Sequence, residues 1–183
     1  MSESGFQSFA AAKGFHPQTL ARWLSWPLAD RGVLAKLTLD LKIGENQLRD
    51  LMDWSEEIAL RDGIAIAAIF AGKAIDAIAT DPRLGRADKV KRIKESLRRL
   101  RFPRLAQAED EIHGKIRALK LQPEIRVTVA PGLEGGRLQI EFSVTNQQDF
   151  KRLAEKLATA AETSFSYEIF SLLGVTAKSP KNA

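Results

Sequence analysis

The chain contains no cysteine. This absence excludes a disulfide framework, a thiolate nucleophile and every metal site built on thiolate ligands. It also fits a protein of the reducing cytoplasm, where we expect this one to be located. Histidine is scarce as well, with only two among 183 residues. The side chains on which metal and nucleophilic catalysis usually depend are therefore few.

Long hydrophobic runs and a targeting segment are also missing. The most apolar stretch, residues 64–78, is interrupted by Lys73 and Asp76 and is too short to span a bilayer. The first five residues lack the basic and apolar regions of a signal peptide. With 44% hydrophobic and 28% charged residues, the composition is that of a soluble globular protein of one domain or two small ones. We expect no membrane partner.

Positive charge is concentrated in one stretch, from Arg86 to Arg104. It holds nine basic and two acidic residues, a net charge of +7, whereas the whole chain carries +5. The excess is therefore one local surface rather than a property of the whole protein. A local cationic surface attracts polyanions, with nucleic acid as the first expected partner and an acidic protein as the second.

The same stretch has the pattern of an amphipathic helix. Its apolar residues recur at intervals of 3, 4 and 3, which places them on one stripe of an α-helix. They are Val90, Ile93, Leu97 and Leu100. The side chains that we expect to contact phosphate are Lys89, Lys91, Arg92, Lys94, Arg98, Arg99, Arg101 and Arg104. A solvated face, on which Arg and Lys stems cover apolar surface, is the alternative interpretation.

Gly, Pro and turn-rich positions divide the chain into three parts. Residues 1–80 have short helical patterns and no strand signal, which predicts a helical domain ending at the loop near residue 80. The basic helix and a helix–hairpin–helix dimerisation module are expected over residues 86–174, and a disordered tail over 175–183. The predicted fold class is α+β, mainly α: an N-terminal helical bundle, a long basic helix, then a β-hairpin flanked by amphipathic helices.

Residues 125–129 and 138–144 each alternate apolar and polar side chains, with turn-forming residues between them. This pattern predicts an antiparallel hairpin with one buried face. The apolar residues of that face are Ile125, Val127, Val129, Leu138, Ile140, Phe142 and Val144. Residues 145–148 then have the form of a capping box, in which Thr145 would be the cap of the following helix.

A two-stranded hairpin is only marginally stable by itself. Its edges, and the helical stripe of Phe150, Leu153 and Leu157 that follows, need more partners than this chain obviously supplies. A two-fold dimer, with strands pairing across the axis and two such helices meeting, would satisfy both. Coverage by the N-terminal helices is the alternative.

The order of helix, strand, Gly-rich turn, strand and capped helix over residues 105–157 resembles the C-terminal dimerisation module of ParB-type chromosome and plasmid partition proteins. The segments that carry the resemblance are residues 125–129, 135–142 and 149–157. It implies strands and a helix that pair with their copies, and lysines that bind DNA without sequence preference. The dimer core that it implies is Ile140, Phe142, Phe150, Leu153 and Leu157.

This chain also departs from that family. It has no counterpart of the family's nucleotide-binding N-terminal domain, so CTP-dependent clamping is not expected. The polar face of its predicted hairpin is poorer in lysine than the family's DNA-binding face. We therefore expect the basic helix, rather than the hairpin, to bind DNA.

The spacing of Ala10, Gly14 and Leu20 is typical of a helix-turn-helix. Gly permits the tight turn, and small residues let the two helices cross closely. In a DNA-binding unit of this kind, the second helix would present Gln18, Thr19 and Arg22. Two packed helices without contact to DNA are the alternative interpretation.

Catalytic patterns are weak. Glu109 and His113 share a helical face, but two side chains do not make a metal site, and a surface ion pair is expected instead. Gly132, Gly135 and Gly136 precede a predicted strand rather than a helix, which favours a hairpin turn over a phosphate-binding loop. No set of nucleophile, base and orienting residue is recognisable, and no cofactor is expected.

The leading hypothesis is a non-enzymatic, dimeric nucleic-acid-binding protein with largely sequence-independent phosphate contacts. It would be associated with the nucleoid if its ligand is DNA. The alternative is a helical adaptor or accessory subunit whose basic helix docks on an acidic protein partner. An enzyme of unrecognised type is the third possibility.

Overall fold

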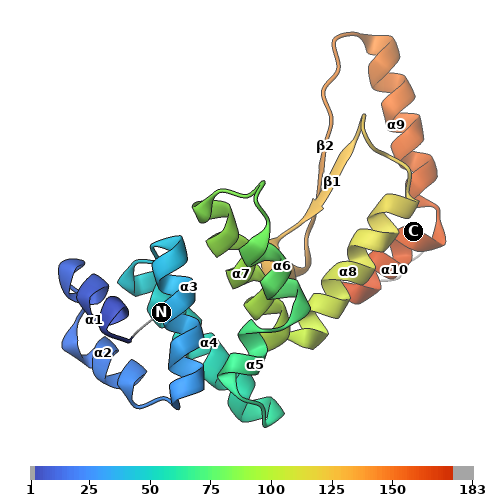
Figure 1. Ribbon diagram of the computed structural model, residues 1–183. Helices are drawn as coiled ribbons and strands as arrows, with labels where there is room; N and C mark the ends of the chain where they lie inside the picture. The colour runs from blue at the N-terminus through green and yellow to red at the C-terminus, as the bar shows by residue number, and fades with distance from the viewer. Residues whose placement is uncertain (1–2, 175–183) are drawn as a thin grey trace. The chain divides into compact units, whose positions relative to one another are not determined.

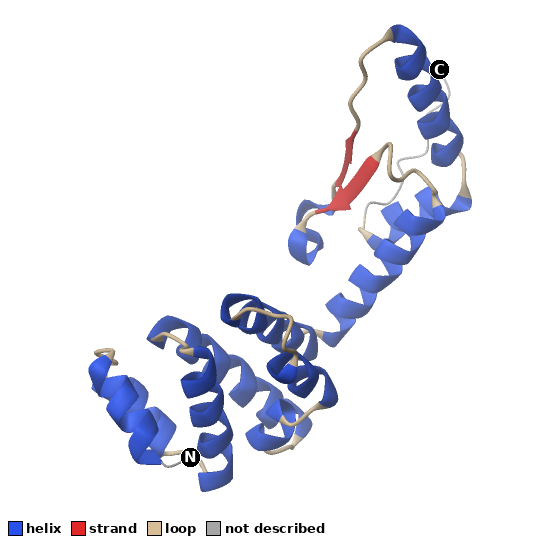
Figure 2. Ribbon diagram, turned by 45° about the horizontal axis from the view of Figure 1, so that its top comes forward, coloured by secondary structure: helices blue, strands red, loops and turns tan. Residues whose placement is uncertain are grey.

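The structure is a computed structural model that describes residues 3–174, and it confirms the predicted fold class (Figure 1). Most of these residues are helical, and the strands among them form one two-stranded antiparallel sheet. Figure 2 shows this hairpin in red among blue helices. The expected tail over residues 175–183 lies outside the described residues. Within the described range, no helix combines the length and the hydrophobicity needed to cross a bilayer.

The chain divides into two compact units, residues 1–102 and 103–183. This division differs from the expected boundary near residue 80, because the apolar stripe of the basic helix belongs to the same core as the helices before it. The helices of the first unit are α1 (Glu3–Ala12), α2 (Pro17–Leu24), α3 (Leu28–Leu41), α4 (Glu45–Asp62), α5 (Ile66–Phe70), α6 (Lys73–Thr80) and α7 (Arg86–Arg101).

Helix α4 contributes a continuous buried face to this core. The buried positions recur at helical spacing along its whole length, which explains why an otherwise polar sequence folds as a helix here. They are Leu48, Leu51, Met52, Ser55 and Ile58. The helix ends where Gly63 adopts a left-handed backbone conformation, with φ at 66°. Its buried face contacts α5 and α7.

The corner between α1 and α2 has the geometry that the sequence predicts. Gly14 has φ at 70°, a conformation that glycine adopts without steric cost, and Ala10 is fully buried. Beyond the corner, the ring of Trp23 packs on Phe6 with 4.3 Å between centroids. The indole Nε1–H of Trp23 donates to the carbonyl of Arg31 at 3.0 Å, so this buried ring also satisfies its polar atom.

Asp30 is a buried carboxylate on α3 that caps another helix. The residue before α5, Ala65, has no side chain that could accept a hydrogen bond from the first turn. Asp30 Oδ1 accepts from the backbone N–H of Ala67 at 2.7 Å instead. One of the donors left unpaired at the start of α5 is thereby satisfied from a neighbouring helix.

The second unit contains the predicted hairpin. Within residues 103–174, β1 pairs antiparallel with β2, with Arg126 opposite Glu141 and Val127 opposite Ile140. The second strand ends at Glu141 and is shorter than the expected 138–144. The elements are α8 (Pro103–Ala118), β1 (Arg126–Val129), the 3-10 segment η1 (Pro131–Gly136), β2 (Leu138–Glu141), α9 (Gln147–Ala161) and α10 (Ser164–Leu172).

The buried face of the hairpin is smaller than predicted. Ile125 and Val127 are buried among apolar residues of α8, α9 and α10. Ile140 and Val144, by contrast, are 40% and 38% exposed. The first strand and the residue before it supply the core, whereas the second strand contributes only partly buried side chains such as Leu138. A two-stranded sheet leaves its outer strand largely uncovered within one chain.

The cap of α9 is Asn146 rather than Thr145, so the predicted cap position was wrong by one residue. The side-chain oxygen of Asn146 accepts from the N–H of Asp149 at 2.8 Å. Its backbone is extended, with φ at −149°, as expected for a residue just before a helix. Asn and Thr both favour this position, and the local sequence offered both.

The cap that Asp30 provides leads to a stability prediction. The variant Asp30→Ala leaves the N–H of Ala67 without its partner and should lower the free energy of unfolding by about 1–2 kcal/mol. Urea denaturation of the full chain measures this change. The control is Asp40→Ala, which removes an exposed carboxylate of the same helix and should cost under about 0.5 kcal/mol. Equal losses in both variants would contradict the capping role.

Candidate nucleic-acid interface

The basic stretch forms one continuous helix, as predicted. Helix α7 begins after Gly85 and ends at Arg101, just before Pro103, which has no N–H to continue it. Val90, Ile93 and Leu97 of the predicted apolar stripe are buried. Leu100 is 43% exposed and lies outside the hydrophobic core, so the stripe is one residue shorter than expected.

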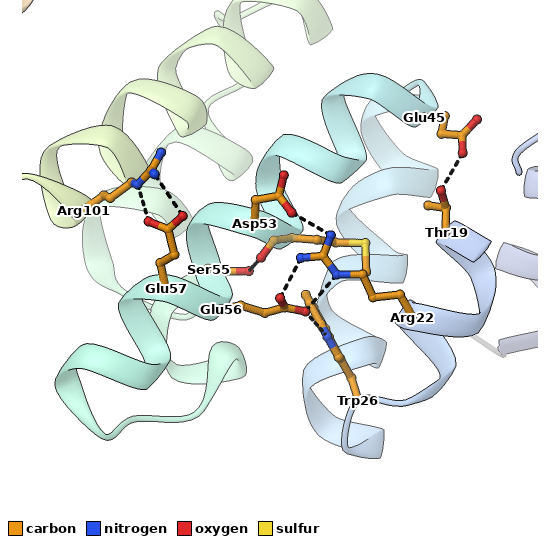
Figure 3. A network of polar contacts seen from close by, with 10 residues as sticks. Thr19, Arg22, Trp26, Glu45, Asp53, Ser55, Glu56, Glu57 and Arg101 are labelled. Carbon is orange, nitrogen blue, oxygen red and sulfur yellow. Dashed lines mark hydrogen bonds and ion pairs between the residues drawn. The ribbon is translucent and has the colours of Figure 1, made fainter.

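The inner side of α7 faces the most acidic helix of the unit. Helix α4 has six acidic and two basic residues, a net charge of −4, and α7 has eight basic and two acidic ones, a net charge of +6. Lys94 Nζ lies 2.7 Å from Asp50 Oδ2, and Arg101 Nη2 lies 2.9 Å from Glu57 Oε1. The second contact is drawn in Figure 3. Two of the eight cationic side chains that we expected at phosphates are therefore paired with carboxylates of α4.

These two ion pairs have the same sequence separation, 44 residues. The two helices therefore run in the same direction, with the pairs seven residues apart. A seven-residue interval returns a side chain to nearly the same helix face, as in the flanking ion pairs of a coiled coil. Buried apolar residues lie beside the pairs on both helices. The acidic pair Asp50 and Glu57 is thus matched in register by Lys94 and Arg101.

Two more cationic side chains bind backbone carbonyls at the C-termini of helices. Arg61, near the end of α4, donates from Nη1 to the carbonyl of Arg101 at 2.7 Å and from Nη2 to that of Leu100 at 2.8 Å. Lys89 Nζ donates to the carbonyl of Ala79 in α6 at 2.8 Å. Cations at helix C-termini satisfy unpaired carbonyls and oppose the negative end of the helix dipole. Lys89 therefore has a structural partner inside the unit.

The outer side of α7, opposite the apolar stripe, carries Lys91, Arg92, Arg98 and Arg99, whereas Arg86 lies in line with the stripe at the start of the helix. Arg86, Lys91 and Arg92 are exposed, and among the described residues none of the three has a carboxylate within ion-pair distance. Arg98 is paired with Glu95 at 2.8 Å and is half-buried, as is Arg99. The remaining expected residue, Arg104, is exposed on α8 in the second unit. Lys89, Lys94 and Arg101 are instead engaged within the first unit.

Two carboxylates remain charged beside these outer cations. The hydrogen bond from Arg98 lowers the pKa of Glu95 below its ordinary value. The hydrogen bonds from Arg83, with a small contribution from the positive charge of Arg92, hold the pKa of Asp81 at about 2. Both acids are ionised at neutral pH and compete with any anion for the same cations. The outer side is therefore cationic but interrupted.

The structure has the corner between α1 and α2 that the helix-turn-helix spacing predicts. Two of the three side chains expected to face DNA, however, contact other residues of the chain. Thr19 is buried, and its hydroxyl donates to Glu45 Oε1 at 2.6 Å. The guanidinium of Arg22 contacts Asp53 and Glu56, each at 2.6 Å, and its pKa is raised, chiefly by the hydrogen bond with Glu56. Figure 3 shows these carboxylates of α4 around the α2 side chains.

Of the three side chains expected to face DNA, two are thus bound to α4. Gln18 alone of this set is exposed. The structure supports the alternative interpretation, two helices packed into the core. The abundance of acidic residues in α4 was a signal for this arrangement, but their partners are more than 25 residues away and have no local pattern.

The residues of the expected dimer core lie in different environments. Leu153 is buried in the core of its own unit, so it is not available to a partner chain. Phe150 is 53% exposed and Ile140 is exposed as well. Phe142 is half-buried, with its ring centroid 6.4 Å from that of Phe150, and Leu157 is half-buried too. Phe150 and Ile140 are therefore the two members of this set that are left exposed.

Glu109 is a buried structural carboxylate rather than half of a surface ion pair with His113. Its Oε1 accepts from the backbone N–H of Gly132 at 3.3 Å, which ties α8 to the turn of the hairpin. Gly132 and Gly135 have positive φ in this turn, which is the hairpin connection that the sequence predicted. Across residues 3–174, no group of three or more His, Asp or Glu side chains is arranged to hold a metal ion.

No known protein family, curated protein or solved structure matches this chain. The resemblance of residues 105–157 to the ParB dimerisation module therefore stays a prediction.

The register of α4 on α7 gives a prediction about stability. Glu57→Ala and Arg101→Ala should each lower the free energy of unfolding, and the double-mutant cycle should give a coupling of about 0.5–1 kcal/mol. Urea denaturation at low and high salt measures it, and the coupling should shrink as salt screens the pair. The control is Glu57→Ala combined with Arg92→Ala, for which no coupling is expected. A coupling as large in the control would contradict the pairing.

Proposed function

We propose that this protein is a non-enzymatic, dimeric nucleic-acid-binding protein. Its binding surface is the outer side of α7, with Lys91, Arg92, Arg98 and Arg99, and its contacts go to phosphates. The observation that carries the proposal is the division of charge on α7. Acidic residues of α4 neutralise cations on the inner side, whereas Lys91 and Arg92 on the outer side remain exposed without an ion pair in the described part of the chain.

The way α7 is packed supports contacts without sequence preference. A helix that reads bases enters the major groove with its side chains on base edges. Helix α7 instead packs on α3, α4 and α6, and so presents only one side. Its sequence has no Asn or Gln, the side chains that pair with adenine, and its exposed Lys and Arg side chains suit phosphate oxygens.

The dimer in this proposal forms through the outer face of α9. A mostly apolar groove of about 700 Å³ lies along this helix, lined by Phe150, Ala154 and Ala158 at intervals of four residues. Small side chains at two of these positions allow a second helix to approach closely. Ile140 and Val144 are further exposed apolar side chains of the same unit. Burial of these side chains would supply the driving force for association.

The charges beside the groove are self-complementary. Lys151 and Glu155 are both exposed, and the distance between their charged atoms within one helix is 3.9 Å, the limit of an ion pair. If two copies of α9 pack antiparallel around Ala154, Phe150 meets Ala158 of the other copy. Lys151 then lies near the other copy's Glu155. Two-fold symmetry produces each of these contacts twice.

A helical adaptor that docks on an acidic protein surface is the second candidate function. The pairing of α7 with α4 favours it, because this helix already binds an acidic helix of its own chain. Competition separates the two: heparin and duplex DNA displace a nucleic-acid contact, whereas a mixed apolar and acidic protein contact is largely retained.

The nucleic-acid proposal predicts a measurable salt dependence. The double variant Lys91→Ala, Arg92→Ala should weaken the binding of a 20-base-pair duplex and lower the slope of log affinity against log salt by about 1.8, since each phosphate contact contributes about 0.9. Fluorescence anisotropy between 50 and 200 mM salt measures both. The matched control is Lys36→Ala, Lys73→Ala, which removes two exposed lysines of the same unit and should leave the slope unchanged.

A second variant should change the affinity for the duplex in the opposite direction, toward tighter binding. Glu95→Gln removes an acid from the outer side of α7 and should tighten duplex binding about two- to fivefold, because this carboxylate no longer competes with phosphate for the neighbouring cations. Asp40→Asn makes the same change of net charge at an exposed i,i+4 ion pair elsewhere in the unit. If both variants bind the duplex more tightly by the same factor, binding depends on net charge alone and not on the outer side of α7. If the unmodified chain does not bind the duplex, the proposal is refuted.

The dimer predicts a dependence on Phe150. Phe150→Asp should shift the mass measured by light scattering after size-exclusion chromatography from dimer to monomer, because it places a charge in the apolar groove. Tyr167→Asp is the control, since it alters an exposed aromatic side chain on α10 and should leave the dimer intact. Lys151→Glu and Glu155→Lys should each weaken the dimer, and combining them should restore it. If the unmodified chain is a monomer, the proposed dimer is contradicted.

A further inference from the structure

A second groove lies in the first unit, between α3, α5 and α6. It is a cavity of about 240 Å³ whose floor is formed by Leu41, Phe70 and Ile75, all buried, and whose walls include Val33 and Leu37. A cavity of about 150 Å³ in a protein core holds a benzene molecule. This groove therefore has room for one large apolar side chain, and its open side gives access from solvent.

The rim of the groove carries a negative charge that the chain does not compensate. Lys36 and Asp40 pair with each other at 2.6 Å, so their charges largely cancel. Asp76, also on the rim, is exposed, and no cation lies within ion-pair distance of it in the described part of the first unit. Helix α6 ends at Thr80 on the same rim, where Lys89 Nζ binds the carbonyl of Ala79, so the uncompensated charge of the rim is that of Asp76.

We propose that this groove docks a cationic amphipathic segment of another protein. A large apolar side chain of that segment fills the cavity, and a neighbouring Lys or Arg pairs with Asp76. The charge of the rim argues against the other ligand classes, because phosphate groups and acidic peptides are repelled there. This surface differs in sign from the outer side of α7, so one unit can hold a polyanion and a cationic protein segment at different places.

NMR mapping with two defined peptides tests this proposal. The probes are 14-residue helical peptides with Leu along one face and either Lys or Glu at all other positions, added to the full-length 15N-labelled chain. The Lys peptide should shift the amide signals of Leu37, Ile75 and Ala79 before others, and the Glu peptide should not. Asp76→Asn should weaken binding of the Lys peptide about two- to fivefold, as expected for an exposed ion pair.

A matched pair of variants locates the site. Ala71→Trp fills the groove from its exposed edge and should abolish the shifts. Ala68→Trp places the same side chain at an exposed position of α5 outside the groove and should preserve them. Three results would overturn the proposal. In the first, the amide signals respond equally to both peptides, and in the second, the largest shifts lie outside the groove. In the third, the same shifts arise when the chain is concentrated without peptide. The last outcome would identify a second copy as the occupant. None of these results depends on nucleic-acid binding.

Discussion

The packing of α7 against α4 is the interaction on which the first unit and its candidate site depend. Buried side chains of both helices join one core, and two ion pairs at a seven-residue interval set the helices in register. Arg61 then satisfies carbonyls at the end of α7. This arrangement decides which cations of α7 belong to the interior contacts and which remain on the surface.

The division of charge follows from the geometry of a helix. A helix with basic residues around most of its circumference cannot leave all of them in solvent when one side packs. Those that flank the apolar stripe, Lys94 and Arg101, meet carboxylates of α4, and those opposite it, Lys91 and Arg92, do not. The exposed cationic surface of α7 is therefore narrower than the sequence suggests, and Glu95 interrupts it.

The second unit shows how a small sheet leaves apolar surface uncovered. Its core takes side chains mainly from α8, β1, α9 and α10, whereas β2 and the outer face of α9 keep Ile140 and Phe150 exposed. The two units thus differ in what they offer to partners. The first has a cationic helix side and an apolar groove with an acidic rim, and the second has exposed apolar side chains on β2 and α9.

The sequence by itself determined the local elements: the helical period of α7, the alternation of the hairpin and the glycine corner at Gly14. These depend on spacing between near neighbours, which any reader of the sequence can recover. Only the tertiary structure decided the unit boundary, the burial of Leu153, and the capture of Thr19, Arg22, Lys94 and Arg101 by α4. An ion pair between residues 44 positions apart leaves no local pattern, because the energy that selects it arises only after the core has brought the helices together.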